Sequence, residues 1–275
     1  MHRDGYLPEV SIIIPVCNEA VKTVNCFASI RANTKIPYEI IWVDNGSHPE
    51  NFGLIKRQAT KPHVHTKLIH LKKNVGFVKA TNIGINEAEK SSKYIILLNN
   101  DTEVSHRWAT KLITPLIKDS KVGAVGPVTQ SKISWQEAGH LNRRWNLQIP
   151  QFPKSREKKD IIYNYSNILA DMFKNKYIDV GNLPLSFFCA AFRKETFNQV
   201  GLLDEDFGLG LGDDDEYCFR LRAHKYKLVL SLETFVFHHH RSTFTSLKLP
   251  VDSIRRKNIR TLRDKKKAIT KDLNE

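Results

Sequence analysis

The chain has 275 residues, 41% of them hydrophobic, and a formal net charge of +14 at pH 7. This is enough apolar sequence for the core of one large domain or two small ones. The longest apolar runs, residues 10–16 and 94–98, are far shorter than the roughly 20 residues that cross a bilayer, and residues 1–6 lack the apolar segment of a signal peptide. Four scattered cysteines without a C-x-x-C pair favour buried thiols over a disulfide framework or a zinc site. We therefore expect a cytoplasmic protein.

The positive charge indicates anionic partners, which include anionic substrates, phosphorylated lipid surfaces and nucleic acid. Much of the charge lies after residue 250, and a second basic cluster spans residues 154–159. Neither cluster is interleaved with aromatic residues that stack on bases, so we expect no nucleic-acid partner. The basic tail is interpreted as a solvated helix, as a segment that makes peripheral contact with an anionic membrane or binds an acidic glycan, or as a disordered segment.

Strands and helices alternate in the first 127 residues. Short apolar runs predict strands at residues 10–16, 39–43, 67–71, 94–98 and 122–127. Helical spacing of apolar residues predicts helices at about 20–32, 48–58, 77–88 and 108–118. This order predicts an α/β protein with a mostly parallel central sheet and helices on both faces.

The pattern after residue 128 is less regular. Residues 129–183 are rich in aromatic residues and are interpreted as an excursion from the core rather than as a separate domain. Further strands are expected at 185–192, 226–230 and 234–237, and further helices at 194–200 and 217–223.

Polar residues follow three of the predicted strands directly. Asn18 and Glu19 follow the first strand, Asp44 ends the second, and residues 99–101 follow the fourth. Ligands of open parallel sheets bind beyond the carboxyl ends of the strands. Asp101 is therefore expected at the mouth of a site, where it can bind a divalent cation that in turn holds a diphosphate. The alternative is an ordinary Asn/Asp turn.

Two later polar runs are also candidates for chemistry. The acidic residues 213–216 can supply a general base, or they can simply stabilise the N-terminus of a helix. The histidines 238–240 can form a metal site or a surface cluster. Arg241 has a planar group that suits a phosphate.

Taken in order, these motifs resemble those of the family 2 glycosyltransferases. They are SIIIPVCN at 11–18, WVDNGS at 42–47, NVGF at 74–77, LNNDT at 98–102, FRKETFNQVGLLDED at 192–206, GDDDEYCFR at 212–220 and FH at 237–238. The resemblance covers residues 10–245, and the rhamnosyltransferase-like branch is the most similar.

The resemblance implies a GT-A nucleotide-diphosphosugar transferase fold. The transferase domain would span residues 10–249, after an extension at 1–9 and before a basic tail at 250–275. Residues 10–127 would bind the nucleotide sugar, and residues 128–249 would hold the acceptor and the catalytic groups. The implied reaction is inverting transfer of a hexosyl or deoxyhexosyl group. Its donor would be a UDP-, dTDP- or GDP-sugar, and its acceptor a hydroxyl of a glycan, a lipid-linked molecule or a protein.

The resemblance also assigns roles to individual residues. Asp214 takes the position of the general base, with Asp213 as the second candidate. Asp101 would bind Mn²⁺ or Mg²⁺, with His238 completing the coordination and His240 in reserve. The nucleotide-sugar site would comprise Pro15, Asn18, Glu19, Asp44, Asn74, Gly76, Asn82, Asn99 and Asn100.

The chain departs from the family pattern at two points. Asn99 occupies the first position of the DxD motif, and its neutral oxygen predicts a weaker metal site that depends partly on the donor. The acidic run carries Asp213 and Glu216 where the family has Glu and Asp. A catalytically silent GT-A-like protein that binds a nucleotide or a glycan is the alternative, and the presence of Asp101 and Asp214 argues against it. Three aromatic residues are interpreted either as stacking platforms for acceptor sugars or as core: Trp135, Trp145 and Phe188.

Overall fold

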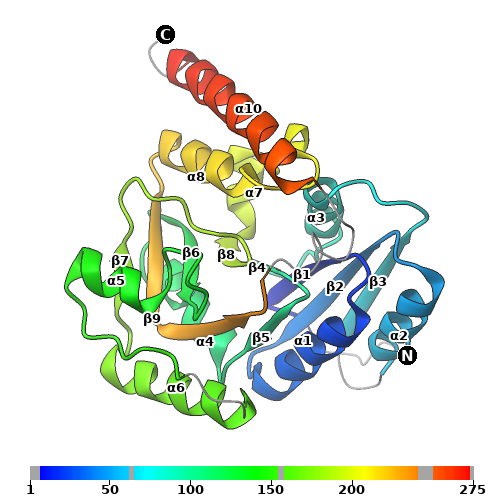
Figure 1. Ribbon diagram of the computed structural model, residues 1–275, viewed down its shortest axis with the longest axis horizontal. Coiled ribbons are helices and arrows are strands. Elements are labelled where there is room, and N and C mark those ends of the chain that lie inside the picture. The colour runs from blue at the N-terminus through cyan, green and yellow to red at the C-terminus, as the bar shows by residue number, and fades with distance from the viewer. Residues whose placement is uncertain (1–6, 62–64, 154–157, 241–249, 273–275) are drawn as a thin grey trace.

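The structure is a computed structural model that describes residues 7–61, 65–153, 158–240 and 250–272. A single twisted sheet runs through it, and helices lie on both of its faces (Figure 1).

The first half of the chain alternates strictly between strands and helices. Its elements are β1 (Val10–Val16), α1 (Ala20–Asn33), β2 (Tyr38–Asn45), α2 (Pro49–Ala59), β3 (His65–Leu71), α3 (Phe77–Asn86) and β4 (Tyr94–Leu98). β1 pairs with β2 and β4, β2 pairs with β3, and every pairing is parallel. β1 and β2 are buried along their whole length, as expected of parallel strands that helices cover on both faces.

The second half adds a mixed part to the sheet. Its elements are β5 (Thr102–Val104), α4 (Trp108–Lys118), β6 (Val122–Val128), α5 (Ala138–Trp145), α6 (Lys158–Met172), β7 (Tyr177–Asp179), β8 (Cys189–Arg193), α7 (Lys194–Val200), η1 (Glu205–Phe207), α8 (Asp213–Ala223), β9 (Lys227–His238) and α10 (Val251–Asp272). The strand order is β3-β2-β1-β4-β8-β6-β9-β5, with β7 beside β9. β8, β5 and β7 are antiparallel to their neighbours, whereas β6 and β9 pair in parallel. The predicted α/β fold with a mostly parallel sheet is confirmed.

Alternate side chains of the central strands enter two separate cores. Ile13 and Ile41 belong to the core on the α3 side, whereas Ile12, Ile40 and Trp42 belong to the core on the α1 and α4 side. A slip of one residue would exchange the two sets, so burial on both faces fixes the register. The four cysteines are buried and free, which confirms their interpretation as core thiols.

The structure differs from the sequence prediction at several elements, including α5 and α6, which the prediction lacked. β8 begins at Cys189 rather than at 185, because its partner β4 ends at Leu98, opposite Cys189. β9 is one strand rather than two, and the predicted break is a register shift near residues 231–235. α8 begins at Asp213, because Gly212 (φ +121°) ends the preceding loop and leaves the acidic residues in the first helical turn. The prediction also missed β5, and β7 of the 129–183 excursion joins the central sheet.

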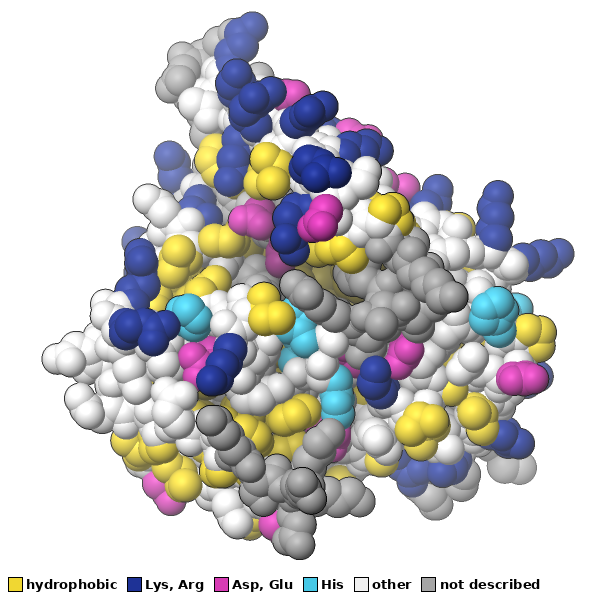
Figure 2. Space-filling model, viewed as in Figure 1, with side chains coloured by type: hydrophobic (Ala, Val, Ile, Leu, Met, Phe, Trp, Pro, Cys, Tyr) yellow, Lys and Arg dark blue, Asp and Glu magenta, His cyan; other side chains and the backbone are white. Residues whose placement is uncertain are grey.

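The basic tail forms α10, which packs on α8 and η1 (Figure 1). Asn258 is 2% exposed, and its side-chain amide donates to the carbonyl oxygens of Phe207 (3.2 Å) and Gly210 (2.7 Å). Lys265 lies 2.7 Å from Asp204 and 2.6 Å from Asp206. α10 is therefore a helix docked beside the acidic run, with most of its basic residues on the outer side (Figure 2). Within the described ranges, no helix is long and apolar enough to span a membrane.

Candidate active site

The candidate residues converge at the edge of the sheet where β1, β2 and β4 end. These strands are parallel neighbours, so the polar residues that follow them share one edge. The end of β9 reaches the same edge through its pairing with β5. Figure 2 shows histidine side chains near the middle of this face, below the basic side chains of α10.

Asp101 and His238 form a buried carboxylate–imidazole pair. Thr102 of β5 is the register partner of His238, and this pairing brings His238 Nε2 to 3.2 Å from Asp101 Oδ1. The two side chains are only 6% and 10% exposed. The imidazole of His238 is also stacked between the rings of Phe188 (4.9 Å, 10°) and His240 (4.9 Å, 13°). The pair is thus held rigidly and offers one oxygen and one nitrogen ligand.

The predicted third metal ligand, His240, contacts His238 by ring stacking. Among the described residues, Asp101, His238 and His240 do not form a group whose ligand atoms all lie within 4.8 Å of one another. The geometry therefore favours His238 over His240 as the partner of Asp101.

The two asparagines before Asp101 shape the turn after β4. The backbone N–H of Asn99 donates to the carbonyl oxygen of Phe188 (2.8 Å). Asn100 is buried, and its amide donates to Thr23 Oγ1 on α1 (2.9 Å). Asn100 therefore anchors the turn to α1, and its predicted contact with the nucleotide sugar stays a prediction.

Asn18 joins the loops that follow β1 and β2. Its backbone N–H donates to Ser47 Oγ (2.7 Å), and its Oδ1 accepts from the backbone N–H of His48 (2.9 Å). Asn18 and Glu19 both have left-handed backbones (φ 58° and 52°), which turn the chain sharply into α1. Pro15 lies inside β1, opposite Val43 of β2. These bonds fix the loop walls at the ends of the first two strands.

Asp44 ends β2 as a fully buried carboxylate (0% exposed). Its Oδ2 lies 2.7 Å from Nδ1 of His70, its register partner on β3, and Phe52 stacks on the His70 ring at 4.0 Å. Within the described chain, Asp44 Oδ1 has no hydrogen-bond partner. Sequence reasoning missed His70 and Phe52, although a histidine near the end of an apolar strand was an available signal.

A network of asparagines and glycines holds the loop after β3. Asn45 donates to Asn74 Oδ1 and to the carbonyl oxygen of Gly76 (both 3.1 Å), and Asn74 Oδ1 also accepts from the Gly76 N–H (2.8 Å). Gly76 has φ +97°, and a Cβ there would lie 2.7 Å from the carbonyl oxygen of Gly208. Gly76 therefore permits close contact between the loop after β3 and the loop that precedes the acidic helix.

Asn82 connects the same two regions from inside the protein. It is 3% exposed; its Nδ2 donates to the carbonyl oxygen of Leu203 (2.9 Å), and its Oδ1 accepts from the Leu203 N–H (3.1 Å). Both functions of the amide are thus used within the protein. The structure places Asn82 as an internal connection between α3 and the loop before α8, and its predicted ligand contact stays a prediction.

The first turn of α8 contains three carboxyl groups with raised pKa values. Burial, together with the charge of Asp215, raises the pKa of Asp213 to about 6. Burial, and then the charges of Asp213 and Asp215, raise the pKa of Asp214 well above its ordinary value. Burial also raises the pKa of Asp215, against the opposing charges of Lys266 and Arg222. These groups hold protons more tightly than exposed carboxyls, a property required of a general base that works near neutral pH.

Glu216 has a different role. Its carboxylate binds Arg220 bidentately, with Nε at 2.7 Å and Nη2 at 2.9 Å. Arg220 in turn donates to the carbonyl oxygens of Val200 and Leu202 (both 2.8 Å). Glu216 therefore stabilises the first turn of α8, and the candidates for the general base narrow to the acidic residues before it.

Two consecutive residues, Phe187 and Phe188, connect the acidic helix to the Asp101–His238 pair. The backbone of Phe187 lies beside the Asp214 carboxylate and acts to lower its pKa. The ring of Phe188 stacks on His238, and its carbonyl oxygen accepts from Asn99. Asp214 and the Asp101–His238 pair therefore lie next to the same two-residue segment of the chain. Sequence reasoning treated this segment as an ordinary strand.

Of the aromatic residues considered for acceptor binding, Phe188 is buried, whereas Trp135 and Trp145 are partly buried and pack against the core. Phe188 is 5% exposed, and His238 covers its ring. Trp135 and Trp145 pack against each other at 6.0 Å, and Trp135 Nε1 donates to the carbonyl oxygen of Pro184 (2.7 Å). Arg241 and residues 154–157 lie outside the described residues.

The mostly parallel sheet with helices on both faces is the GT-A fold of glycosyltransferases. Two solved structures of transferases match the fold. GalNAc-T7, solved with UDP, GalNAc and Mn²⁺, has a TM-score of 0.62 at 19% identity, over 86% of this chain and 44% of that chain. The mannosyltransferase PcManGT of Pyrobaculum calidifontis, in complex with GDP-Man and Mn²⁺, has a TM-score of 0.59 at 18% identity, over 88% and 60%.

The chain belongs to glycosyl transferase family 2, whose family model matches residues 11–201. It is 25% identical over 229 residues to a chondroitin synthase of Pasteurella multocida (strain Pm70), over 78% of this chain and 23% of that protein. It is 24% identical over 233 residues to an inactive polypeptide N-acetylgalactosaminyltransferase-like protein 5 of Macaca fascicularis, over 80% of this chain and 49% of that protein. The chain therefore spans about a quarter to a half of the length of these relatives.

Proposed function

We propose that this chain is a metal-dependent, inverting glycosyltransferase that moves a hexosyl or deoxyhexosyl group from a nucleotide-diphosphosugar to an acceptor hydroxyl. The observation that carries the proposal is the connection through Phe187 and Phe188. It joins a carboxyl group of raised pKa, Asp214, to the buried Asp101–His238 pair. Proton removal from an acceptor and stabilisation of a leaving diphosphate require these two groups at one site.

The donor is proposed to bind across the ends of β1, β2 and β4. Asp44 supports this placement, because its buried Oδ1 has no partner among the described residues and can accept from an N–H of a base. The asparagine network around Asn74 and Gly76 would line the path from the ribose to the diphosphate. UDP-, dTDP- and GDP-sugars all remain within the proposal, since solved relatives contain both UDP and GDP-Man.

The cation is proposed to be Mn²⁺ or Mg²⁺, bound through Asp101 Oδ1 and His238 Nε2. The two residues fit such an ion, because a carboxylate oxygen and an imidazole nitrogen suit Mn²⁺, and the remaining positions suit diphosphate oxygens. When bound, the ion would stabilise the negative charge that develops on the departing diphosphate. The neutral side chain at Asn99 leaves Asp101 as the carboxylate of the motif, so we expect weak metal binding in the absence of donor.

Asp214 is proposed as the general base, with Asp213 as the alternative. As the acceptor oxygen forms a bond to the anomeric carbon, its proton passes to the Asp214 carboxylate. The bond between that carbon and the diphosphate oxygen breaks, and its electron pair leaves with the diphosphate. One displacement of this kind inverts the configuration at the carbon. The raised pKa of Asp214 increases the driving force for taking the proton.

The acceptor is proposed to be a hydroxyl of a glycan, a lipid-linked molecule or a protein. The outer side of α10 supports peripheral contact with an anionic membrane, because its exposed face carries Lys and Arg residues (Figure 2). We propose a cytoplasmic location and no nucleic-acid partner.

A catalytically silent, nucleotide-binding protein is the second candidate, and one observation favours considering it. A relative of similar identity is named as inactive, so membership of the family does not by itself establish catalysis. The presence of both Asp101 and Asp214 supports the enzyme, since each supplies a group that the reaction requires.

A panel of nucleotide sugars tests the proposal. Thermal shift and donor turnover would be measured for UDP-, dTDP- and GDP-sugars with and without Mn²⁺, for the wild type and Asp101→Ala. We expect one donor to raise the Tm only with Mn²⁺ and Asp101→Ala to abolish the effect. Asp264→Asn, at a 66% exposed side chain on α10, is the control and should behave as the wild type. Absence of any nucleotide-dependent shift would contradict the proposal.

A further inference from the structure

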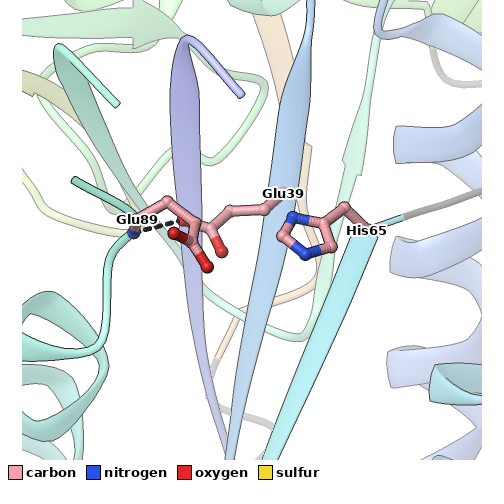
Figure 3. Close-up of side chains that lie close together, drawn as sticks. All are labelled: Glu39, His65 and Glu89. Carbon is pink, nitrogen blue, oxygen red and sulfur yellow. Dashed lines mark hydrogen bonds between the residues drawn. The ribbon is translucent and has the colours of Figure 1, made fainter. Parts of the chain in front are cut away.

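A second acid–histidine cluster lies at the opposite edge of the sheet, where β2 and β3 begin. Glu39 is the second residue of β2 and His65 the first residue of β3, and the two are register partners. Glu89 follows α3 and completes the group (Figure 3). Asp44 is five residues further along β2, so at about 3.3 Å per residue the cluster lies about 16 Å from the candidate active site.

The three side chains are arranged as ligands of one ion. One ligand atom from each of Glu39, His65 and Glu89 can be chosen so that all three lie within 4.8 Å of one another. Figure 3 shows the side chains close together, with His65 on the far side of Glu39 from the Glu89 backbone. A modest movement of the two half-buried residues, His65 and Glu89, would bring these atoms to the spacing of ligands on a single metal ion.

The hydrogen bonding of Glu39 is independent evidence that this cluster binds an ion. It is 1% exposed, and its Oε1 is fixed by Ser11 Oγ (2.5 Å) and by the backbone N–H of Glu89 (2.7 Å). Its Oε2 is buried and has no hydrogen-bond partner in the part of the chain that the structure describes. A buried carboxylate oxygen without a partner is costly, and a cation between the three side chains would satisfy it.

We propose that Glu39, His65 and Glu89 bind a divalent transition-metal ion, with Zn²⁺ as the best match. Carboxylate oxygens and imidazole nitrogens both bind Zn²⁺ in proteins, and a water can occupy the fourth position of a site with three protein ligands. The imidazole disfavours Mg²⁺ and Ca²⁺, which prefer oxygen ligands. The bound ion would connect β2, β3 and the segment before β4, and would stabilise the native state because the unfolded chain lacks the site.

Metal binding in the absence of nucleotide tests this site separately from the proposed transferase site. The background is Asp101→Ala, which disables the other site, so failure of one proposal does not affect the other. The measurements are Zn²⁺ content by mass spectrometry after gel filtration, the Zn²⁺ dissociation constant by calorimetry, and the visible spectrum with Co²⁺ in place of Zn²⁺. Glu39→Gln, His65→Gln and Glu89→Gln are the test variants.

We expect one equivalent of Zn²⁺, a tetrahedral Co²⁺ spectrum and a rise in Tm with Zn²⁺. Each test variant should bind Zn²⁺ about 100-fold more weakly and lose the Co²⁺ spectrum. The control variants are Glu87→Gln, on the neighbouring loop, and His140→Gln, away from the cluster. Both should keep the wild-type Zn²⁺ affinity and the Co²⁺ spectrum. Because Glu39 is buried, circular dichroism would confirm that the Glu39→Gln variant is folded. The Glu89→Gln variant, at a half-buried residue, gives a second test of metal binding. Absence of stoichiometric Zn²⁺, or Zn²⁺ binding that all three variants retain, would overturn the proposal.

Discussion

The same two strands, β2 and β3, carry an acid–histidine pair at each end. Glu39 faces His65 where the strands begin, and Asp44 faces His70 where they end. Both acids are buried, and each has one oxygen without a hydrogen-bond partner among the described residues. The two pairs differ in what surrounds them, which shows that an acid and a histidine in register do not define a function by themselves.

At the carboxyl edge, where β1, β2 and β3 end, these parallel strands lead into loops shaped by Asn18, Gly46 and Gly76, and Gly208 of the loop before the acidic helix contacts Gly76. A ligand can be bound there by several loops at once. At the opposite edge, Glu39 is enclosed by Ser11 and the backbone of Glu89. We therefore assign the first edge to substrate and the second to a structural ion, and the predictions below test that division.

The largest expected effect at the carboxyl edge is that of Asp101→Ala. Removing the carboxylate of the Asp101–His238 pair should lower kcat/KM by about 10³-fold, because the charge on the departing diphosphate loses its stabilisation. Transfer kinetics at several Mn²⁺ concentrations would measure this. A variant that keeps wild-type kinetics and metal dependence would refute the role of Asp101.

The matched variants Asp44→Asn and Glu39→Gln test the division between the edges directly. Asp44→Asn should weaken donor binding by about 10–100-fold, as expected when a buried hydrogen bond worth about 1–3 kcal/mol is disrupted, and should leave Zn²⁺ uptake unchanged. Glu39→Gln should weaken Zn²⁺ binding and leave donor binding unchanged. Calorimetric titration of both variants with donor and with Zn²⁺ would show this. If either variant changed both affinities equally, the two edges would not be separate sites.

The acidic helix should make the carboxyl edge a source of instability at neutral pH. The pKa of Asp213 is raised to about 6 in the folded state, so the native protein binds this proton more tightly than the unfolded chain does. Stability should therefore fall as pH rises through about 6. Asp213→Asn should raise stability at pH 8 by on the order of 2 kcal/mol and have little effect at pH 4. Urea unfolding at both pH values measures this, and equal destabilisation at both would contradict it.

The smallest expected effect lies outside both edges, on α10. Lys267→Gln should weaken binding to phosphatidylglycerol vesicles by about 1 kcal/mol or less and leave transfer to a soluble acceptor unchanged. Substitution is preferred to deletion of α10, because Asn258 and Lys265 hold the loop beside the acidic helix. Lys118→Gln, an exposed lysine on α4, is the control for vesicle co-sedimentation. An equal loss of vesicle binding in both variants would show that binding depends on the net charge of the protein rather than on α10.

Much of the carboxyl edge was predictable from the sequence. The strands before Asn18, Asp44 and Asp101 are short apolar runs, and such runs predict buried strands. The order of the motifs indicated the family. The pairs Asp44–His70 and Glu39–His65 were not predictable, because they depend on which strands are neighbours and in which register. Local sequence patterns contain no such information.

The second half was less predictable for a related reason. The Phe187–Phe188 connection and the single strand β9 depend on which strands pair in the folded protein. The polar residues near 231–234 have the composition of a loop, which is why the sequence predicted two strands there. α10 docks through Asn258, the buried asparagine of a strongly basic helix, together with Lys265.

The central claim is that Asp214 accepts the proton of the acceptor at a site where the donor is already bound. The most direct measurement is transfer rate and donor affinity for Asp214→Asn beside Asp213→Asn. The account predicts that Asp214→Asn lowers kcat by about 10²–10⁴-fold and leaves the donor Kd unchanged, whereas Asp213→Asn keeps substantial turnover. Retained turnover in Asp214→Asn, or loss of turnover in Asp213→Asn alone, would contradict it.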